Sequence, residues 1–253
     1  METRELSRPG IPAGNTATTW LKIIALVFMF MDHAGKMLFP NIPEMRMIGR
    51  IAFPIYVWCM IVGYHYTRSV PKYLLRILIV GLASQPLYNL ALAHTWKEPN
   101  VFLSLSLGLC ALWGIREKNF LSQIWAPAAA ILLATLLNAD YGWKGILLFI
   151  LLYAVRDTRP GIAAVIIAVF LFWGSFYGVT KSFFGFGIDL NKLDPSLSKP
   201  LSSLLRLETY AILSLPFILI RFGNDLKMPR WAGYLLYPWH LALLYALELI
   251  FKK

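Results

Sequence analysis

Long apolar stretches alternate with short polar connections along nearly the whole chain. A helix that crosses a bilayer needs about 20 mostly apolar residues. Stretches close to that length cover residues 20–38, 51–67, 73–93, 101–115, 120–137, 141–155, 161–179, 204–222 and 231–251. The fourth and the sixth are marginal, so the pattern predicts an all-α bundle of about nine transmembrane helices, with a range of eight to ten.

The polar segments outside these stretches define the expected domain organisation. Residues 1–19 form a polar N-terminal tail, and no small-residue cleavage site follows the first apolar stretch. We therefore expect this stretch to be a retained helix and not a signal peptide. Residues 20–253 are expected to form a single transmembrane domain. Its long connection at residues 180–203 contains an aromatic run, Phe183–Gly187, which is typical of a lid, a lateral gate or a headgroup-level aromatic belt.

Composition supports the membrane interpretation. Hydrophobic residues make up 58% of the 253 residues and charged ones only 15%, whereas soluble domains are about 45–50% apolar and about 25% charged. The net charge of +11 suggests nucleic acid as a partner in a soluble protein, but no helix here carries a continuous basic face. We expect membrane lipids, and no nucleic acid, as partners. The basic connections slightly favour a cytoplasmic N-terminus.

The strongest functional signal is the pair Asp32-His33, late in the first apolar stretch. An ionisable side chain there must face the bundle interior or a watery cavity. Histidine titrates near neutral pH, so His33 is a candidate general base, with a hydrogen-bonded bundle histidine as the alternative. Asp32 is rotated about 100° away, and an ion pair with Lys36 is its structural alternative. Lys22 lies 11 residues before His33, on the same face and about 16 Å away.

Basic residues gather on both sides of the second apolar stretch. Arg68, Lys72 and Arg76 lie where the second stretch ends and the third begins, which suits either the phosphates of a cosubstrate or snorkelling to lipid phosphate. Arg46 and Arg50 precede the second stretch on the opposite side, toward which His33 lies. These two arginines either line an acceptor site or anchor headgroups.

Other candidate residues carry weaker signals. His240 follows Pro238, whose ring frees a backbone carbonyl nearby, and taken alone it is typical of an interfacial histidine. His65 is expected at a helix end and His94 in a loop. The sequence has no C-x-x-C, H-E-x-x-H or phosphate-binding glycine motif, so we expect no metal.

Several segments carry a resemblance to a known family. They are DHAGKMLFP, RMIGRIAFPIYVWCMIVGYHYTRS, KYLLRILIVGLASQPLYNL, PNVFLSLSLGL, DYGWKG and YLLYPWHLALL, in family order from about Leu21 to Tyr245. On these segments the chain resembles the TraX family of integral membrane acetyltransferases, which includes a pilin acetylase. It is distantly similar to the OafA-type acyltransferases and to heparan-alpha-glucosaminide N-acetyltransferase.

The resemblance implies a transmembrane acyltransferase that takes acetyl-CoA from the cytoplasm. His33 acts as general base or transient acyl carrier, with Asp32 beside it. The acceptor is an amine or a hydroxyl on a peptide N-terminus, an amino sugar or a small molecule. The OafA-type spacing of a basic residue before the histidine matches Lys22 and His33. The paired arginines of those families match Lys72 and Arg76 less well.

The remaining site residues also follow from the resemblance. The coenzyme A phosphates are assigned to Lys22, Arg68, Lys72 and Arg76. Supporting or acceptor-side positions that match family motifs are Asn100, Asp140, Tyr141 and His240. For Asp140 a helix cap is the structural alternative.

Two other classes of function compete with acetyl transfer. A proton-coupled transporter or flippase would use Asp32, His33 and His240 as a relay. Such transporters often have repeated halves, and no internal repeat is evident in the sequence. A non-catalytic membrane scaffold would not need Asp32-His33 in an apolar helix.

Overall fold

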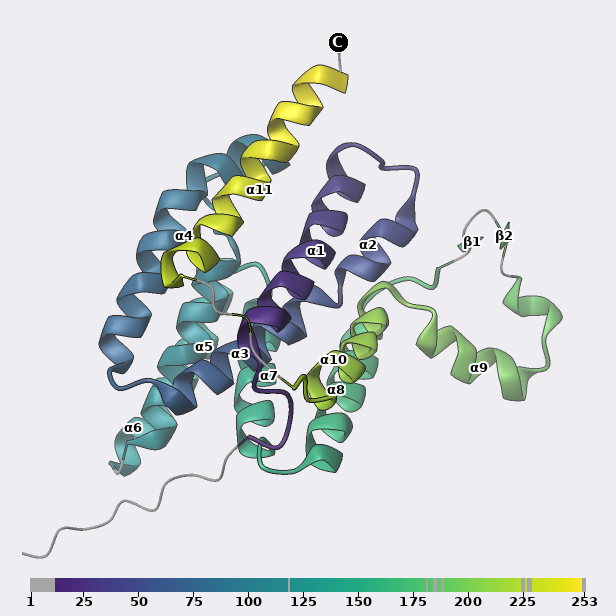
Figure 1. The fold of residues 1–253 in the computed structure, drawn as a ribbon. Coiled ribbons are helices and arrows are strands. Elements are labelled where there is room, and N and C mark those ends of the chain that lie inside the picture. Colours follow the sequence, from purple (N-terminus) through teal and green to yellow (C-terminus); the bar gives the residue numbers. More distant parts are fainter. Residues whose placement is uncertain are drawn as a thin grey trace, which may run out of the picture.

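The described part of the chain is almost entirely helical. The computed structural model describes residues 12–117, 119–180, 182–183, 186–187, 189–223, 226 and 229–251. Part of the polar tail, and Phe184 and Gly185 of the aromatic run, lie outside these residues. Figure 1 shows a bundle of packed helices with one segment that extends beside it. The prediction of an all-α fold is confirmed for the described residues, where the one sheet has two short strands.

The helices follow the apolar stretches closely. In chain order the elements are α1 (Thr18–Met37), α2 (Pro43–Gly49), α3 (Ala52–Tyr66), α4 (Val70–Leu92), α5 (Val101–Arg116), α6 (Phe120–Leu136), α7 (Gly142–Ala154), α8 (Arg159–Gly174), β1 (Ser182–Phe183), β2 (Phe186–Gly187), η1 (Leu190–Lys192), α9 (Pro195–Leu204), η2 (Leu207–Ser214), α10 (Leu215–Leu219) and α11 (Arg230–Phe251). Among the nine predicted stretches, the eighth differs most from expectation, because it is divided between the 3-10 helix η2 and the short helix α10.

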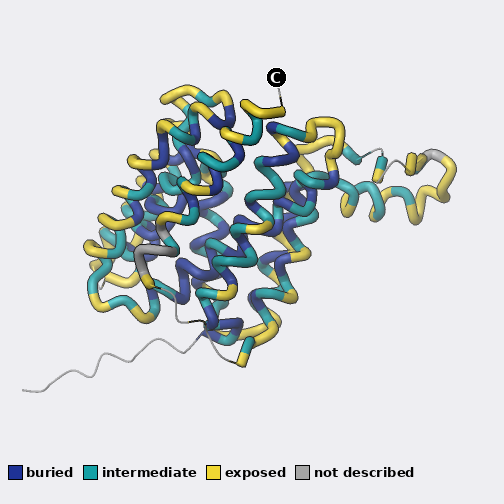
Figure 2. The backbone as a smooth tube through the Cα atoms, turned by 45° about the horizontal axis from the view of Figure 1, so that its top comes forward, coloured by how far each residue is buried: buried dark blue, intermediate teal, exposed yellow. Residues whose placement is uncertain are grey.

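The centre of the bundle is α3, which is buried all round. Ile55, Val57, Trp58 and Ile61 are fully shielded from solvent, and α3 is in contact with α1, α5, α7 and η2. A helix that is hydrophobic on every face belongs in the core of a protein or in a membrane. Figure 2 shows the buried residues gathered along the middle of the bundle, with exposed residues along its outside.

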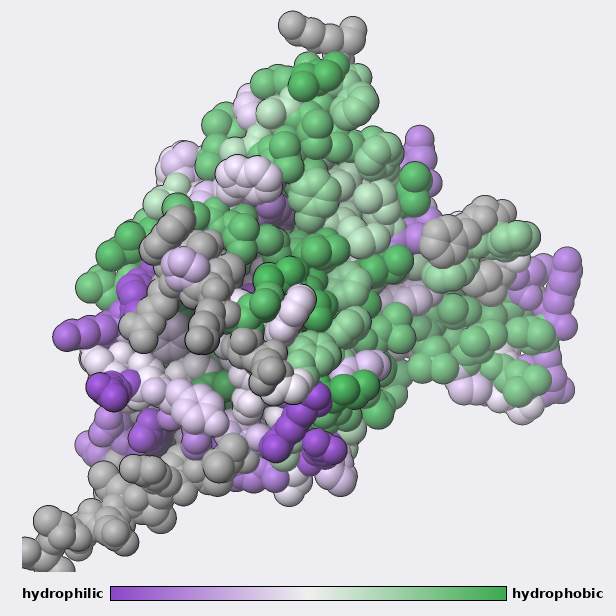
Figure 3. Space-filling view, viewed as in Figure 1, coloured by the Kyte–Doolittle hydropathy of each residue, from purple (hydrophilic) through white to green (hydrophobic). Residues whose placement is uncertain are grey.

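The outer helices expose apolar side chains. Leu82 in α4, Trp125 in α6 and Leu136 at the end of α6 are each at least 66% exposed. Two segments of the described chain are long and apolar enough to cross a membrane, Pro43–Tyr66 and Val70–Leu92, and several shorter helices are also apolar. In Figure 3 hydrophobic residues cover much of the visible face and hydrophilic ones gather mainly toward its lower edge.

The short helix α2, absent from the prediction, positions charged residues beside α1. Pro43 stands at its first position, where a missing N–H costs nothing. Two glycines allow α1 and α2 to approach closely. A Cβ at Gly49 would lie 2.3 Å from the Cβ of Asp32, and one at Gly35 would lie 2.8 Å from the Cβ of Met45. This approach places Arg50, immediately after α2, next to Asp32.

The segment between α8 and η2 extends to one side of the bundle (Figure 1). It corresponds to the predicted connection at residues 180–203, and contains β1, β2, η1 and α9. No residue of α9 is buried. Arg206 connects the two ends of the segment, because its guanidinium donates to the carbonyl oxygens of Ser175 at 2.9 Å and Tyr177 at 3.1 Å.

Candidate functional site

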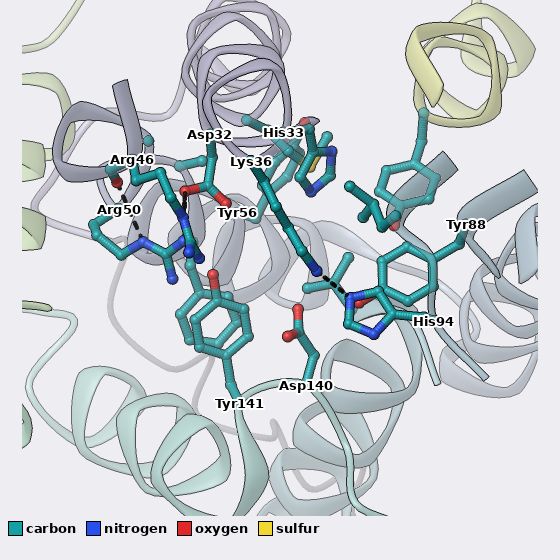
Figure 4. Close-up of a pocket in the computed structure, with 17 residues that line it drawn as sticks. Asp32, His33, Lys36, Arg46, Arg50, Tyr56, Tyr88, His94, Asp140 and Tyr141 are labelled. Atoms are coloured by element: carbon teal, nitrogen blue, oxygen red, sulfur yellow. Dashed lines mark hydrogen bonds and ion pairs between the residues drawn. The ribbon is translucent and has the colours of Figure 1, made fainter. Parts of the chain in front are cut away.

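A polar cavity lies at the end of the bundle where α1 ends. It has a volume of about 190 Å³. Most of its polar lining comes from α1, from α2 and the residue after it, and from the two loops that precede α5 and α7 (Figure 4). Its polar residues are Asp32, His33, Lys36, Arg46, Arg50, Tyr56, Tyr88, His94, Asp140, Tyr141 and Tyr237. The structure thus brings together six of the predicted site residues, Asp32, His33, Arg46, Arg50, Asp140 and Tyr141.

Two further spaces continue from the polar cavity toward the opposite end of the bundle. An apolar passage of about 90 Å³ shares Met29, Tyr56, Val101 and Tyr237 with the polar cavity. A basic basin of about 970 Å³ shares Lys22 and Tyr73 with the passage.

The basin also contains the predicted basic cluster. Arg68, Lys72 and Arg76 line it and are exposed. Polar cavity, apolar passage and basic basin therefore border one another in series through the bundle.

His33 and His240 form a hydrogen-bonded pair at the wall of the cavity. His33 Nδ1 and His240 Nε2 lie 3.0 Å apart, and His240 Nδ1 lies 3.3 Å from the carbonyl oxygen of Leu236. A carbonyl only accepts, so His240 Nδ1 carries a proton and its Nε2 accepts from His33 Nδ1. His33 Nε2 is then the unprotonated nitrogen. His240 is 2% exposed, so the expectation of an interfacial histidine is wrong.

Asp32 belongs to a buried chain of ion pairs and not to a pair with Lys36. Arg50 lies between two carboxylates, with Nη2 2.5 Å from Asp32 Oδ1 and Nη1 3.2 Å from Glu208 Oε1. Arg46, which is more exposed, lies 3.7 Å from the same Asp32 oxygen. The chain links α1, the end of α2 and η2. Arg50 thus has an internal ion-pairing role and does not anchor headgroups.

Lys36 instead crosses toward the loop that follows α4. Its Nζ lies 2.7 Å from His94 Nε2, and His94 Nδ1 lies 3.3 Å from Glu98 Oε2. The His94 ring stacks on Tyr88 with centroids 4.9 Å apart. Lys36 is exposed, so this contact lies at the outer edge of the cavity (Figure 4).

Asp140 and Tyr141 reach the cavity from the loop between α6 and α7. The ring of Tyr141 stacks on Phe53, with centroids 3.5 Å apart. The Asp140 carboxylate points into the cavity (Figure 4) and has no hydrogen-bond or ion-pair partner among the described residues. Desolvation by the surrounding protein raises the pKa of the Asp140 carboxyl from 3.8 to about 6, although the charge of Arg50 opposes this. Asp140 does not cap α7, whose N-cap is Tyr141.

Asn100 lines none of the three spaces. Asn100 is 2% exposed and caps α5, accepting a hydrogen bond from the N–H of Phe102 at 3.1 Å. Its amide also donates to the carbonyl of Gly81 at 2.8 Å, which ties α5 to α4. Asn100 is therefore placed as a structural residue.

The sequence interpretation missed Glu208 and the tyrosines at positions 56, 88 and 237, and it gave little weight to His94. A carboxylate at the edge of an apolar stretch was the one available signal for Glu208. No cluster of three or more metal-ligating side chains occurs in the described part of the chain.

Comparisons with known proteins identify the family of the chain. The TraX protein family profile matches residues 17–248. The chain is 26% identical to the probable fimbrial assembly protein FimC of Dichelobacter nodosus, over 88% of this chain and 92% of that protein. It is 28% identical to Protein TraX of Escherichia coli, over 59% of this chain and 62% of that protein.

An uncharacterized protein of Rickettsia prowazekii is 29% identical over 56% of this chain and 57% of its own length. The chain thus spans less than two thirds of the Rickettsia and Escherichia coli relatives. No solved structure matches it. Because the family profile covers most of its length, the chain belongs to the TraX family.

Proposed function

We propose that this protein is an integral membrane acetyltransferase that transfers an acetyl group from acetyl-CoA to an amine. The observation that carries the proposal is the series of spaces that leads from a basic basin, through an apolar passage, to a paired histidine. The exposed apolar outer helices and the family membership support a bundle embedded in a bacterial inner membrane. The basin then faces the cytoplasm, on the same side as the N-terminus.

The basin suits the phosphates of coenzyme A. Arg68, Lys72, Arg76 and Lys22 line one space, and Arg76 Nε donates to the carbonyl oxygen of Lys72 at 3.0 Å, which orients the guanidinium. Arginine and lysine bind phosphate through charge-assisted hydrogen bonds. The apolar passage suits the uncharged arm that carries the thioester, because its lining is mainly aliphatic, aromatic and sulfur-containing. The basin supplies affinity, and the passage delivers the acetyl group to the polar cavity.

We assign the role of the base to His33. Its Nδ1 donates to His240, so Nε2 has a free lone pair. The acceptor nitrogen attacks the thioester carbon while His33 Nε2 takes a proton from that nitrogen. Collapse of the tetrahedral intermediate breaks the carbon–sulfur bond, and the thiolate leaves as coenzyme A after it takes up the proton that His33 Nε2 received. An amide and a free thiol are the products.

Asp140 supports an amine as the acceptor. Its unpaired carboxylate in the cavity suits the ammonium form of a primary amine, which releases one proton to water before the neutral amine attacks. The printed name of the FimC relative refers to fimbrial assembly. On that basis we propose the N-terminal amine of a pilus protein as the acceptor.

Weaker binding of acetyl-CoA is expected when Arg76 is replaced by alanine. Arg76 is exposed, so the loss is modest, at about fivefold in Kd for about 1 kcal/mol. Arg159→Ala is the matched control, since this exposed arginine lies at the same end of the bundle and does not line the basin. Titration calorimetry in detergent measures both. Equal affinity in Arg76→Ala and wild type would contradict the basin assignment.

Acceptor binding is expected to depend on the charge of Asp140. As the pH falls through about 6, the carboxyl gains a proton and loses its attraction for an ammonium group. The kcat/KM for a peptide with a free N-terminal amine should therefore fall below pH 6 in wild type. In Asp140→Asn it should be at least about tenfold lower at pH 7.5 and lack this pH step. An unchanged KM for the peptide in Asp140→Asn would rule out this role.

A further inference from the structure

Two tyrosine hydroxyls lie where the apolar passage meets the polar cavity. Tyr56 and Tyr237 line both spaces, as do Met29 and Val101. Tyr56 comes from α3 and Tyr237 from α11, so the two rings approach the junction from different helices. The junction therefore has two tyrosine side chains between a passage that is otherwise mainly apolar and the polar cavity that contains His33.

Neither hydroxyl has a hydrogen-bond partner among the described residues. Tyr237 is only 5% exposed, and a buried hydroxyl without a partner is costly. The side chains of Tyr56 and Tyr237 line the junction of the two spaces. Two tyrosine hydroxyls without a partner are expected to donate hydrogen bonds to an acceptor atom of a molecule that binds at the junction.

We propose that Tyr56 and Tyr237 form an oxyanion hole for the thioester carbonyl. This inference rests on the proposed function. If the phosphates occupy the basin and the base is His33, the reacting carbonyl lies between passage and cavity, which is the position of these hydroxyls.

The chemistry of the step matches two neutral donors. When the acceptor nitrogen bonds to the carbonyl carbon, the π electrons of the carbonyl move onto its oxygen. Preorganised donors, including tyrosine hydroxyls, stabilise such an oxygen in a water-poor site. Both hydroxyls remain protonated throughout, and His33 accepts the proton from the nitrogen. When the intermediate collapses, the electrons return from the oxygen and expel the thiolate.

The test replaces each tyrosine by phenylalanine in the full chain, purified in detergent. Each variant should lose about 10²–10³-fold in kcat for acetyl transfer to a peptide with a free N-terminal amine. Its affinity for coenzyme A, which has no carbonyl at the sulfur, should stay at the wild-type value. Tyr64→Phe is the matched control. Tyr64 is buried in α3, the helix that also carries Tyr56, and its hydroxyl donates to the Leu112 carbonyl at 3.2 Å. It lines none of the three spaces, so its replacement should leave kcat unchanged.

A second measurement needs no acceptor. Infrared difference spectra of acetyl-CoA labelled with ¹³C at the carbonyl should show a lower stretching frequency when bound to wild type than in water, and a return toward the value in water for Tyr56→Phe/Tyr237→Phe. Wild-type kcat in both single variants, or an unshifted carbonyl in wild type, would overturn the oxyanion hole alone. If the variants lost affinity for coenzyme A by the same factor as kcat, the tyrosines would only shape the passage, and the oxyanion hole would be excluded. If wild type binds no acetyl-CoA, the proposed function itself fails.

Discussion

Replacement of His33 by alanine is expected to abolish acetyl transfer. The variant keeps the basin and the passage but has no base in the polar cavity, so kcat should fall by about 10²–10⁴-fold while the Kd for acetyl-CoA stays unchanged. Release of the coenzyme A thiol, followed with a thiol reagent in the presence of a peptide with a free N-terminal amine, measures the reaction. His65→Ala is the matched control, since His65 lies at the end of α3 and lines none of the three spaces.

Variants of His240 test how His33 is held. In His240→Leu nothing accepts the proton of His33 Nδ1, so the tautomer and orientation of the base are no longer fixed. His240→Gln retains an oxygen that accepts this hydrogen bond, and it should recover part of the activity that the leucine variant loses. Full turnover by His33→Ala would exclude the proposed mechanism, and equal activities of the leucine and glutamine variants would exclude the role of His240.

Arg50→Met is expected to have the largest effect on stability. It leaves Asp32 and Glu208 in the protein interior without the cation that lies between them. Removal of one member of a buried ion-pair network costs about 3–5 kcal/mol in soluble proteins. The midpoint of thermal unfolding in detergent, followed by tryptophan fluorescence, should therefore fall strongly.

Arg46→Met is the control for this prediction. Its side chain is 41% exposed and lies 3.7 Å from Asp32, so its loss should shift the midpoint little. In the triple variant Arg50→Met/Asp32→Asn/Glu208→Gln the uncompensated charges are gone, and part of the stability should return. If Arg50→Met unfolds at the wild-type temperature, the ion-pair chain does not hold α1, α2 and η2 together.

Much of the fold could be predicted because hydrophobicity is a local property. Each of the nine apolar stretches corresponds to a helix, or in one case to η2 with α10. The helix α2 was missed because Pro43–Gly49 is too short, and too mixed in polarity, for a periodic pattern to stand out. The helix α9 was missed because its residues lie in a polar segment with no buried face.

The site could be predicted only in part, because its contacts join residues far apart in the chain. His33 was found from its own position in an apolar stretch. Its partner His240 lies 207 residues away, and no spacing rule connects the two. Helical spacing suggested Lys36 as the partner of Asp32, but tertiary packing turned Lys36 toward His94 and brought Arg50 to the carboxylate instead.

The narrowness of the apolar passage has a consequence for the energy balance of the cell. A membrane enzyme that exposes charged residues at both faces risks becoming a leak for protons and other ions. A passage of about 90 Å³ with mainly apolar walls offers an ion nothing to replace its hydration shell. Once the flexible arm of a thioester fills that space, no continuous file of water remains. In the proposed function, acetyl groups would then cross the membrane while its electrochemical gradient is preserved.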